Sequence, residues 1–104
     1  MGDKPQFLYV VKAVRPEMLT AGLTPEEQTI VGRHFAYLSD LTGKGVVILV
    51  GRTQTTGPET MGLCIFEADD EIAARAIMNQ DPAITGGVMT GTLYPYKVAL
   101  MRGA

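Results

Sequence analysis

The segment TPEEQTIVGRHFAYLSDLTGKG, residues 24–45, is the stretch that decides how the rest of this chain is interpreted. Thr24 is a favoured helix N-cap, Pro25 suits the first helical position, and Glu27 stands where a capping box needs a carboxylate. Gly43 supplies a stop signal at the other end. The spacing therefore predicts one helix over this stretch, and that helix carries the only histidine of the protein.

The histidine, His34, lies within the apolar face of the predicted helix. On a wheel of about 100° per residue, the apolar side chains that share one arc with it are Ile30, Val31, Phe35, Leu38 and Leu41. The imidazole should therefore point toward whatever the helix packs on. A side chain that titrates near neutral pH in such a place is a candidate catalytic group. The alternative is a core histidine that is satisfied by one hydrogen bond.

Length, composition and charge exclude several classes of partner. The chain has 104 residues, of which 46% are hydrophobic, and a net charge of −2, which predicts a single domain over 1–104. No run of Lys or Arg is present, so we expect no nucleic-acid or membrane partner. The longest aliphatic run, 46–50, is too short to span a bilayer. One cysteine fits a reducing compartment, and a cytoplasmic location is expected.

Strand-like segments surround the central helix. The patterns predict strands over 6–15, 46–52, 61–67 and 88 to about 101, with a second helix over 69–80 that Asp69 or Asp70 caps. The residues 53–60 form a polar turn that joins the second and third strands in an antiparallel hairpin. Asp81-Pro82 ends the second helix and starts a short turn, and Pro95 should kink the last strand or mark it as an edge.

The order βαββαβ most simply forms a ferredoxin-like α+β sandwich, in which two helices cover one face of a four-stranded antiparallel sheet. Both faces of the strands look apolar: Phe7, Tyr9 and Val11 oppose Leu8 and Val10, and Val46, Ile48 and Val50 oppose Val47 and Leu49. Two helices cover only one face, so we expect a homodimer that packs sheet to sheet. The alternative is a monomer with an apolar outer face.

Several segments, taken in order and spacing, resemble the YCII family (YciI-like proteins) over nearly the whole chain. They are FLYVV, HFAYLSDL, VGR, LCIFEA, NQDPAITGGV and a closing Tyr-Pro-Tyr before a hydrophobic strand. The resemblance implies a dimeric α+β barrel of ferredoxin-like chains and an active site that pairs His34 with Asp81. Several relatives carry a serine near the start of the third strand, where this chain offers the hydroxyl of Thr60. Most members have no assigned reaction; one relative is a dehydrochlorinase of a chlorinated hydroxyhydroquinone, and muconolactone isomerases are similar in structure.

A histidine paired with a carboxylate is suited to general acid or base catalysis, because the carboxylate fixes the tautomer of a ring that titrates near working pH. Such a pair fits proton abstraction beside a carbonyl. The leading hypothesis is a cofactor-independent lyase or isomerase of a small organic molecule, with His34 as the acid/base and Asp81 orienting it. The second hypothesis is a non-catalytic small-molecule-binding or accessory module that uses the same pocket.

Four further residues are candidates for a binding, interface or structural role. Arg52 ends the second strand and is able to hold an anionic substrate group, or it is a solvated charge at the rim. Tyr94 and Tyr96 line either a pocket or the seam between two copies. Cys64 is expected to be a buried structural thiol. One histidine without a cysteine cluster predicts no metal and no cofactor; haem is left open, since a helical histidine can ligate its iron.

Overall fold

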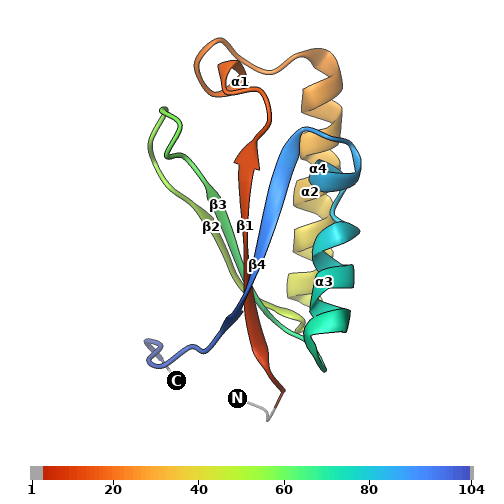
Figure 1. The fold of residues 1–104 in the computed structure, drawn as a ribbon, viewed down its shortest axis with the longest axis vertical. Coiled ribbons are helices and arrows are strands. Elements are labelled where there is room, and N and C mark those ends of the chain that lie inside the picture. Colours follow the sequence, from red (N-terminus) through yellow and green to blue (C-terminus); the bar gives the residue numbers. More distant parts are fainter. Residues whose placement is uncertain (1–3, 104) are drawn as a thin grey trace.

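The computed structural model describes residues 4–103 and contains the predicted order of strands and helices. The main elements are β1 (Gln6–Ala13), α2 (Pro25–Gly43), β2 (Val47–Arg52), β3 (Gly62–Glu67), α3 (Glu71–Asn79) and β4 (Met89–Tyr96). Two short helices, α1 (Glu17–Thr20) and α4 (Pro82–Thr85), lie in the connections that precede α2 and β4 (Figure 1). The predicted short turn after Asp81 is therefore a single turn of helix.

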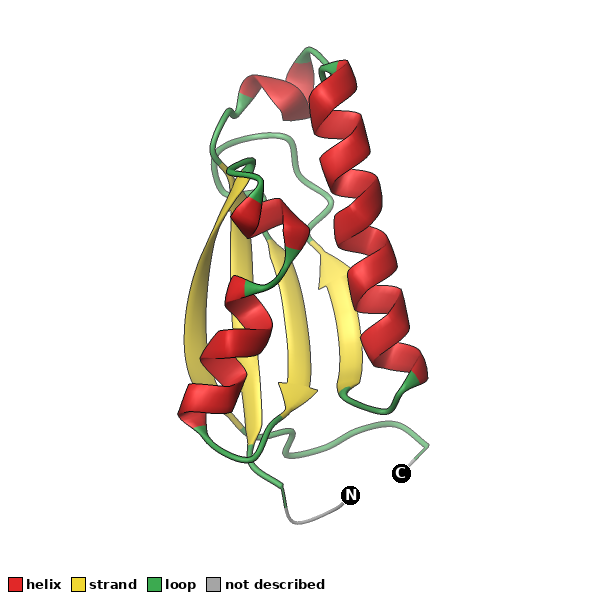
Figure 2. Ribbon diagram, turned by 90° about the vertical axis from the view of Figure 1, so that its right-hand side faces the viewer, coloured by secondary structure: helices red, strands yellow, loops and turns green. Residues whose placement is uncertain are grey.

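The four strands form one antiparallel sheet in the order β2-β3-β1-β4. Figure 2 shows the helices gathered on one face of this sheet, with α2 over the β2 side and α3 over the β4 side. The predicted ferredoxin-like α+β sandwich is confirmed. Pro95 lies in β4, which is an edge strand, where the missing amide hydrogen costs no ladder bond to a further strand. No helix within residues 4–103 has the length and apolar character to cross a membrane.

Capping at the helix N-termini follows the sequence. The Thr24 hydroxyl accepts the Glu27 amide at 3.1 Å, and the Glu27 carboxylate accepts the Thr24 amide at 2.8 Å, which completes the predicted capping box. Of the two candidate caps of α3, Asp70 is the one used, and it accepts the Ala73 amide at 2.8 Å. Both helices therefore begin where local side-chain chemistry predicts.

The buried face of α2 is rotated from the predicted arc. Phe35 was expected on the buried face but is 71% exposed, so that expectation is wrong. Tyr37 packs inward in its place, and its hydroxyl donates a hydrogen bond to the Ile77 carbonyl at 2.6 Å. The rotation arises because α2 packs against α4 as well as β2, which moves the centre of its buried face toward Leu38 and Leu41.

Two strands end earlier than predicted. β1 ends at Ala13 instead of Arg15, and β4 ends at Tyr96 instead of about Met101. The ladder between them runs out because Gln6, the first residue of β1, already pairs with Tyr96. Beyond this point the Gln6 side chain accepts the Val98 amide at 2.6 Å, so the chain is held by a side chain in place of a strand partner.

A β-bulge changes the facing of β2. The register shifts between Val47 and Leu49, so that Val47 opposes Phe66 while Val50 opposes Cys64. Val47 and Val50 therefore both face the helices, whereas simple alternation had placed them on opposite faces. The extra residue of the bulge reverses the alternation, which the amino-acid pattern alone does not reveal.

Side-chain volume falls along the helix-facing side of β1 and β3. The successive cross-strand pairs are Phe7–Phe66, Tyr9–Cys64 and Val11–Gly62. The two phenyl rings lie 6.0 Å apart between centroids, and the Tyr9 ring meets Phe66 edge-on at 5.6 Å. The aromatic end of this series joins the buried core, while the glycine end leaves space between the sheet and the helices.

The outer face of the sheet is apolar as well, as the strand pattern predicts. Leu8, Val10, Leu63 and Ile65 are half-buried there, and the more exposed apolar side chains are Leu49, Tyr94 and Tyr96. The sheet-to-sheet homodimer that this face suggests stays a prediction.

Candidate functional site

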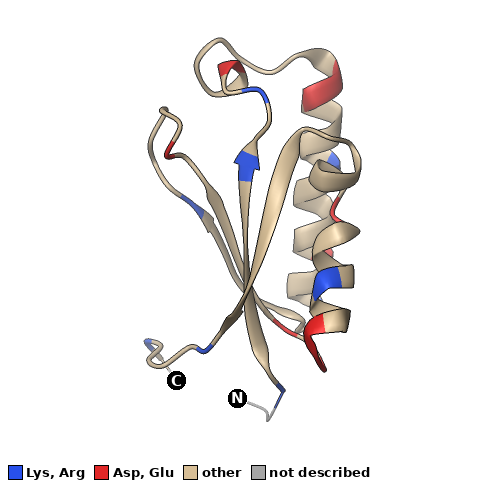
Figure 3. Cartoon of the chain, viewed as in Figure 1, with Lys and Arg blue, Asp and Glu red and all other residues tan. Residues whose placement is uncertain are grey.

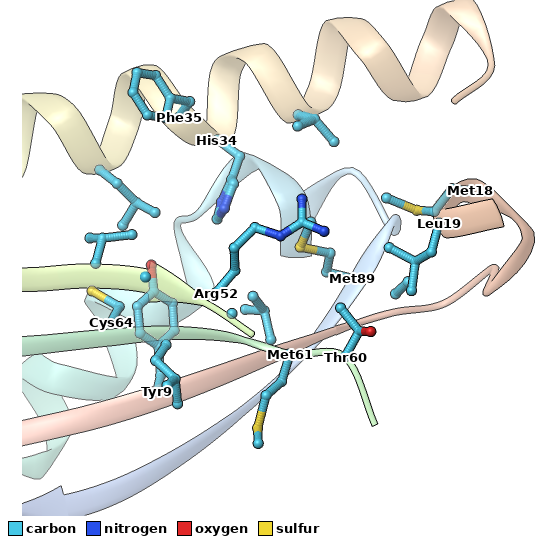
Figure 4. Close-up of a pocket in the computed structure, with 18 of the residues that line it drawn as sticks. Tyr9, Met18, Leu19, His34, Phe35, Arg52, Thr60, Met61, Cys64 and Met89 are labelled. Carbon is cyan, nitrogen blue, oxygen red and sulfur yellow. The ribbon is translucent and has the colours of Figure 1, made fainter. Parts of the chain in front are cut away.

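A cavity of about 560 Å³ lies between the helix-facing side of the sheet and the helices α1 and α2. Its wall on α2 consists of Val31, His34, Phe35 and Leu38; α1 contributes Met18 and Leu19; and the strands contribute Val11, Val50, Arg52, Cys64 and Met89, among others. Figure 4 shows the imidazole of His34 and the guanidinium of Arg52 pointing into this space from opposite walls. The volume and the apolar lining are typical of a site for a small organic molecule.

Asp81 is a fully buried carboxylate at the inner end of this site, and three donors converge on it. His34 Nδ1 lies 2.7 Å from Oδ1 and 2.8 Å from Oδ2. The Tyr9 hydroxyl donates to Oδ2 at 2.8 Å, and the Ala83 amide donates to Oδ1 at 2.9 Å. The Tyr9 hydroxyl and the Ala83 amide match an ionised carboxylate, which only accepts hydrogen bonds, and His34 Nδ1 then donates to it as well.

The contact with Asp81 fixes the orientation of His34. With Nδ1–H donated to the carboxylate, the neutral ring carries its lone pair on Nε2. The side chain is 15% exposed and lines the cavity, and within residues 4–103 Nε2 makes no hydrogen bond. The nitrogen that is free to accept a proton therefore faces the place where a ligand would lie.

Three distant parts of the chain supply this cluster. His34 comes from the middle of α2, and Tyr9 comes from the centre of β1. Asp81 is the N-cap of α4, and its backbone carbonyl also accepts the Ile84 and Thr85 amides at 2.9 and 3.0 Å. The same residue that begins α4 therefore holds the imidazole, because α4 packs directly against α2.

Burial keeps two other groups of the site neutral. Desolvation, followed by the charges of Cys64 and Asp81, raises the pKa of Tyr9 well above its usual range, so the phenol remains a donor. Desolvation also raises the pKa of Cys64 to about 12. Cys64 is therefore a buried thiol and a poor nucleophile near neutral pH, in line with its expected structural role.

The remaining predicted site residues separate into two groups. Arg52 and Thr60 line the cavity; the Thr60 hydroxyl is also 2.7 Å from that of Thr55, within the β2–β3 turn. Tyr94 does not line this cavity, because it opposes Leu8 on the outer face of the sheet. That position matches the predicted seam between two copies better than it matches a pocket wall.

Sequence reasoning missed Tyr9 as a member of the site. It was assigned to the core because it alternates with Phe7 and Val11, and it is indeed buried at 1% exposure. A signal was present, however, since a tyrosine on the buried face of a strand requires a partner for its hydroxyl. The only carboxylate buried as deeply as that ring is Asp81, among the residues that the structure describes.

Few groups here suit a metal ion. Between residues 4 and 103, no three His, Cys, Asp or Glu side chains gather closely enough to form a metal site. Both oxygens of Asp81 are engaged, so His34 Nε2 is the atom of this pair that a metal or haem iron would contact.

The sequence pattern of the YCII-related domain matches residues 3–96, and the chain therefore belongs to the YCII-related domain family. The family resemblance inferred from the sequence is confirmed. Among curated proteins, no match to the chain was found.

Two solved structures are similar to the chain at low sequence identity. The 5-chloro-2-hydroxyhydroquinone dehydrochlorinase TftG from Burkholderia phenoliruptrix AC1100, in complex with 2,5-dihydroxybenzoquinone, is similar with a TM-score of 0.61 and 18% identity, covering 88% of this chain and 93% of that one. SnoaB from Streptomyces nogalater, a cofactor-independent oxygenase, is similar with a TM-score of 0.48 and 12% identity, covering 99% and 100% of the two chains. At 18% identity, the likeness to TftG concerns the fold.

Proposed function

We propose that this protein is a cofactor-independent enzyme, a lyase or isomerase that transfers a proton on a small organic molecule bound in the cavity. The observation that carries the proposal is the orientation of His34, whose Nδ1 is held by a fully buried carboxylate while Nε2 faces the cavity. A core histidine without a chemical role would not need its second nitrogen to face an apolar pocket.

In this mechanism His34 Nε2 removes a proton from a carbon next to a carbonyl group, and the electron pair moves onto the carbonyl oxygen as an enolate. Collapse of the enolate either expels a leaving group from the neighbouring carbon, which is a lyase reaction, or takes the proton back from the imidazolium at another position, which is an isomerase reaction. Asp81 offsets the imidazolium charge, and the donors Tyr9 and Ala83 hold that carboxylate in place.

The structural comparison supports the class of substrate. The dehydrochlorinase TftG has the same fold over 93% of its chain, and its structure holds 2,5-dihydroxybenzoquinone, a small cyclic molecule with acidic oxygens. We extend to this protein only the general class, namely a small ring compound with a carbonyl or enol oxygen, because identity is 18%. The apolar lining of the cavity agrees with a ring of this kind.

Substitution of His34 tests the proposal most directly. The protein would be assayed against a panel of halogenated hydroquinones, hydroxyquinones and unsaturated lactones, and for deuterium uptake from D₂O into bound compounds by NMR. His34→Gln should lower kcat by about 10² to 10⁴-fold, the usual contribution of a general acid or base. Arg33→Gln, on the exposed side of the same helix, is the control and should retain activity. Turnover that survives in His34→Gln would contradict the assignment; binding without turnover or exchange in the wild-type protein would favour a binding module.

The proposal names no cofactor, and the absorbance spectrum of the purified protein checks this. A Soret band that disappears in His34→Ala would assign haem and overturn a cofactor-independent mechanism. We also propose a cytoplasmic location, which the single free cysteine, Cys64, supports because such a chain needs no oxidising compartment for a disulfide within it. We also propose that two copies pack through the apolar outer face of the sheet, and a monomeric mass in solution would contradict that assembly.

A further inference from the structure

We propose that the substrate is an anion, and that Arg52 binds its charged oxygen group beside His34. The inference rests on the proposed function for the choice of site and deepens it by naming the class of molecule. That class is a small apolar body with one planar oxyanion, either a carboxylate or the anion of an acidic hydroxyquinone. Arg52 is then a binding residue that places the reacting carbon against His34 Nε2.

The first support is that the guanidinium of Arg52 has no partner on the protein. Between residues 4 and 103 it makes no hydrogen bond and no ion pair, although it lines the cavity. Arg15, by contrast, is bound to Glu27 through two nitrogen atoms, at 2.6 and 2.9 Å. Arg33 is also unpaired among these residues and is exposed, as Arg52 is, but Arg33 lies outside the cavity, whereas Arg52 lines it. A guanidinium fork matches the two oxygens of a carboxylate or of an enolised diketone.

The second support is the sign of the charge inside the cavity. Among residues 4–103, no Asp or Glu lines it, and the ionisable groups that do are Tyr9, His34, Arg52 and Cys64. Tyr9 and Cys64 stay neutral because burial raises the pKa of each. Asp81 lies behind the imidazole with both oxygens engaged, so Arg52 provides the one permanent charge that faces the cavity from residues 4–103. Figure 3 shows that charged residues are few along the strands and stand near their ends.

The third support is the space around Arg52. Its cross-strand partner is Gly62, which has no side chain to cover the guanidinium or to compete for it. A Cβ atom at Gly62 would lie 2.9 Å from Val11 Cγ2, so a larger residue would close the floor of the cavity at this place. The guanidinium therefore reaches over bare backbone, next to apolar side chains that suit the body of a ring compound.

These features combine into one binding geometry. In the proposed complex the oxyanion pairs with Arg52, the ring lies on the apolar lining, and the acidic C–H group faces His34 Nε2. Figure 4 shows the two protein side chains, His34 and Arg52, between which such a molecule would lie. The negative charge that grows on the carbonyl oxygen during proton removal is stabilised by the same guanidinium. Neutral analogues of equal size lack the group that Arg52 needs and bind less tightly.

Two pairs of matched probes test the proposal without a known substrate. The first pair is 2-naphthoate and 2-naphthamide, and the second is 2-hydroxy-1,4-naphthoquinone and its 2-methoxy ether. Binding would be measured by ¹H–¹⁵N NMR titration of the full chain, with the signals of Gly51 and His34 reporting the site. The wild-type protein should prefer the anion of at least one pair by about tenfold or more, as expected for a charge-assisted contact. The pair with the larger preference identifies the oxyanion as a carboxylate or a hydroxyquinone.

The variants separate this inference from the proposed function. Arg52→Gln should remove the preference for the anion, while Arg33→Gln should keep it. His34→Gln should also keep it, because binding of the anion does not require proton transfer. Equal binding of both members of both pairs, binding of no probe by the wild-type protein, or a preference that survives in Arg52→Gln would overturn the anion site. A failure of the catalytic role of His34 would appear in turnover alone and would leave these affinities unchanged.

Discussion

The layer between the sheet and the helices has two halves with opposite character. At one end Phe7 and Phe66 are buried at 5% and 0% exposure and pack against Leu38 and Met78. At the other end, two pairs further along the same strands, Val11 and Gly62 border a cavity of about 560 Å³. The comparison teaches that a gradient of side-chain size on two neighbouring strands opens the space, which the connection through α1 then covers.

Asp81 lies on the boundary between these halves. Its donors come from the packed side through Tyr9 and from the open side through His34. The rigid half therefore fixes the carboxylate, and the carboxylate fixes the orientation of an imidazole in the open half. The proposed function requires both, because an unpacked carboxylate would not hold one tautomer, and a fully packed layer would leave no room for a ligand.

The largest expected effect comes from breaking the packed half. Phe66→Ala should lower the free energy of unfolding by about 3 to 5 kcal/mol, because the removed ring is fully buried and the surrounding aromatic side chains collapse only partly. Val50→Ala is the control in the open half, where the side chain is 41% exposed and its loss should cost about 1 kcal/mol. Urea unfolding measures both. Equal losses would show that the two halves do not differ in packing.

An intermediate effect is expected at the boundary. Asp81→Asn should lower the free energy of unfolding by about 1 to 3 kcal/mol, because the new amide nitrogen then faces at least one of the three donors. Asp70→Asn is a matched control, since Asp70 also caps a helix but serves only the Ala73 amide, and asparagine caps as well as aspartate. Thermal unfolding compares the pair. A similar loss of stability in both variants would mean that the helix cap alone accounts for the contribution of Asp81 to folding.

The smallest effect is a pH dependence at the roof of the open half, where Arg15 ties the connection through α1 to Glu27 on α2. This ion pair and the Thr24 amide lower the pKa of Glu27 from 4.5 to about 2. Because the folded-state pKa is depressed, the stabilisation is complete above about pH 4.5 and is lost as pH falls toward 2. The stability difference between wild type and Glu27→Gln should therefore shrink over that range, while Glu26→Gln shows no such trend. A constant difference for Glu27→Gln would contradict the ion pair.

Local signals in the sequence predicted most of the fold. The capping box of Thr24 and Glu27, the edge position of Pro95 and the break at Asp81-Pro82 depend on chemistry within a few residues, and each was confirmed. The predictions that were wrong concern features that are set by residues distant in the sequence. The bulge in β2 and the end of β4 are set by the strands beside them, and the rotation that exposes Phe35 is set by α4.

The candidate site likewise contains residues that the sequence predicted and one that it did not. His34 and Asp81 were identified from a helical stripe and a family resemblance, and the structure places them in contact. Tyr9 was missed because its strand pattern describes burial and does not name the acceptor of its hydroxyl, which is 72 residues away. The catalytic role of this group stays a proposal, because contact alone does not show turnover.

The dual use of Asp81 has a consequence for how related sequences should be compared. One carboxylate begins α4 and aligns the imidazole, so its loss is harmful to folding even in a protein that catalyses nothing. Retention of an aspartate at this place among relatives is thus expected from folding alone and says little about chemistry. His34 is the more informative position, since beyond the contact of its Nδ1 with Asp81 its Nε2 supports no described part of the fold, and selection for a reaction or a ligand would act on that nitrogen.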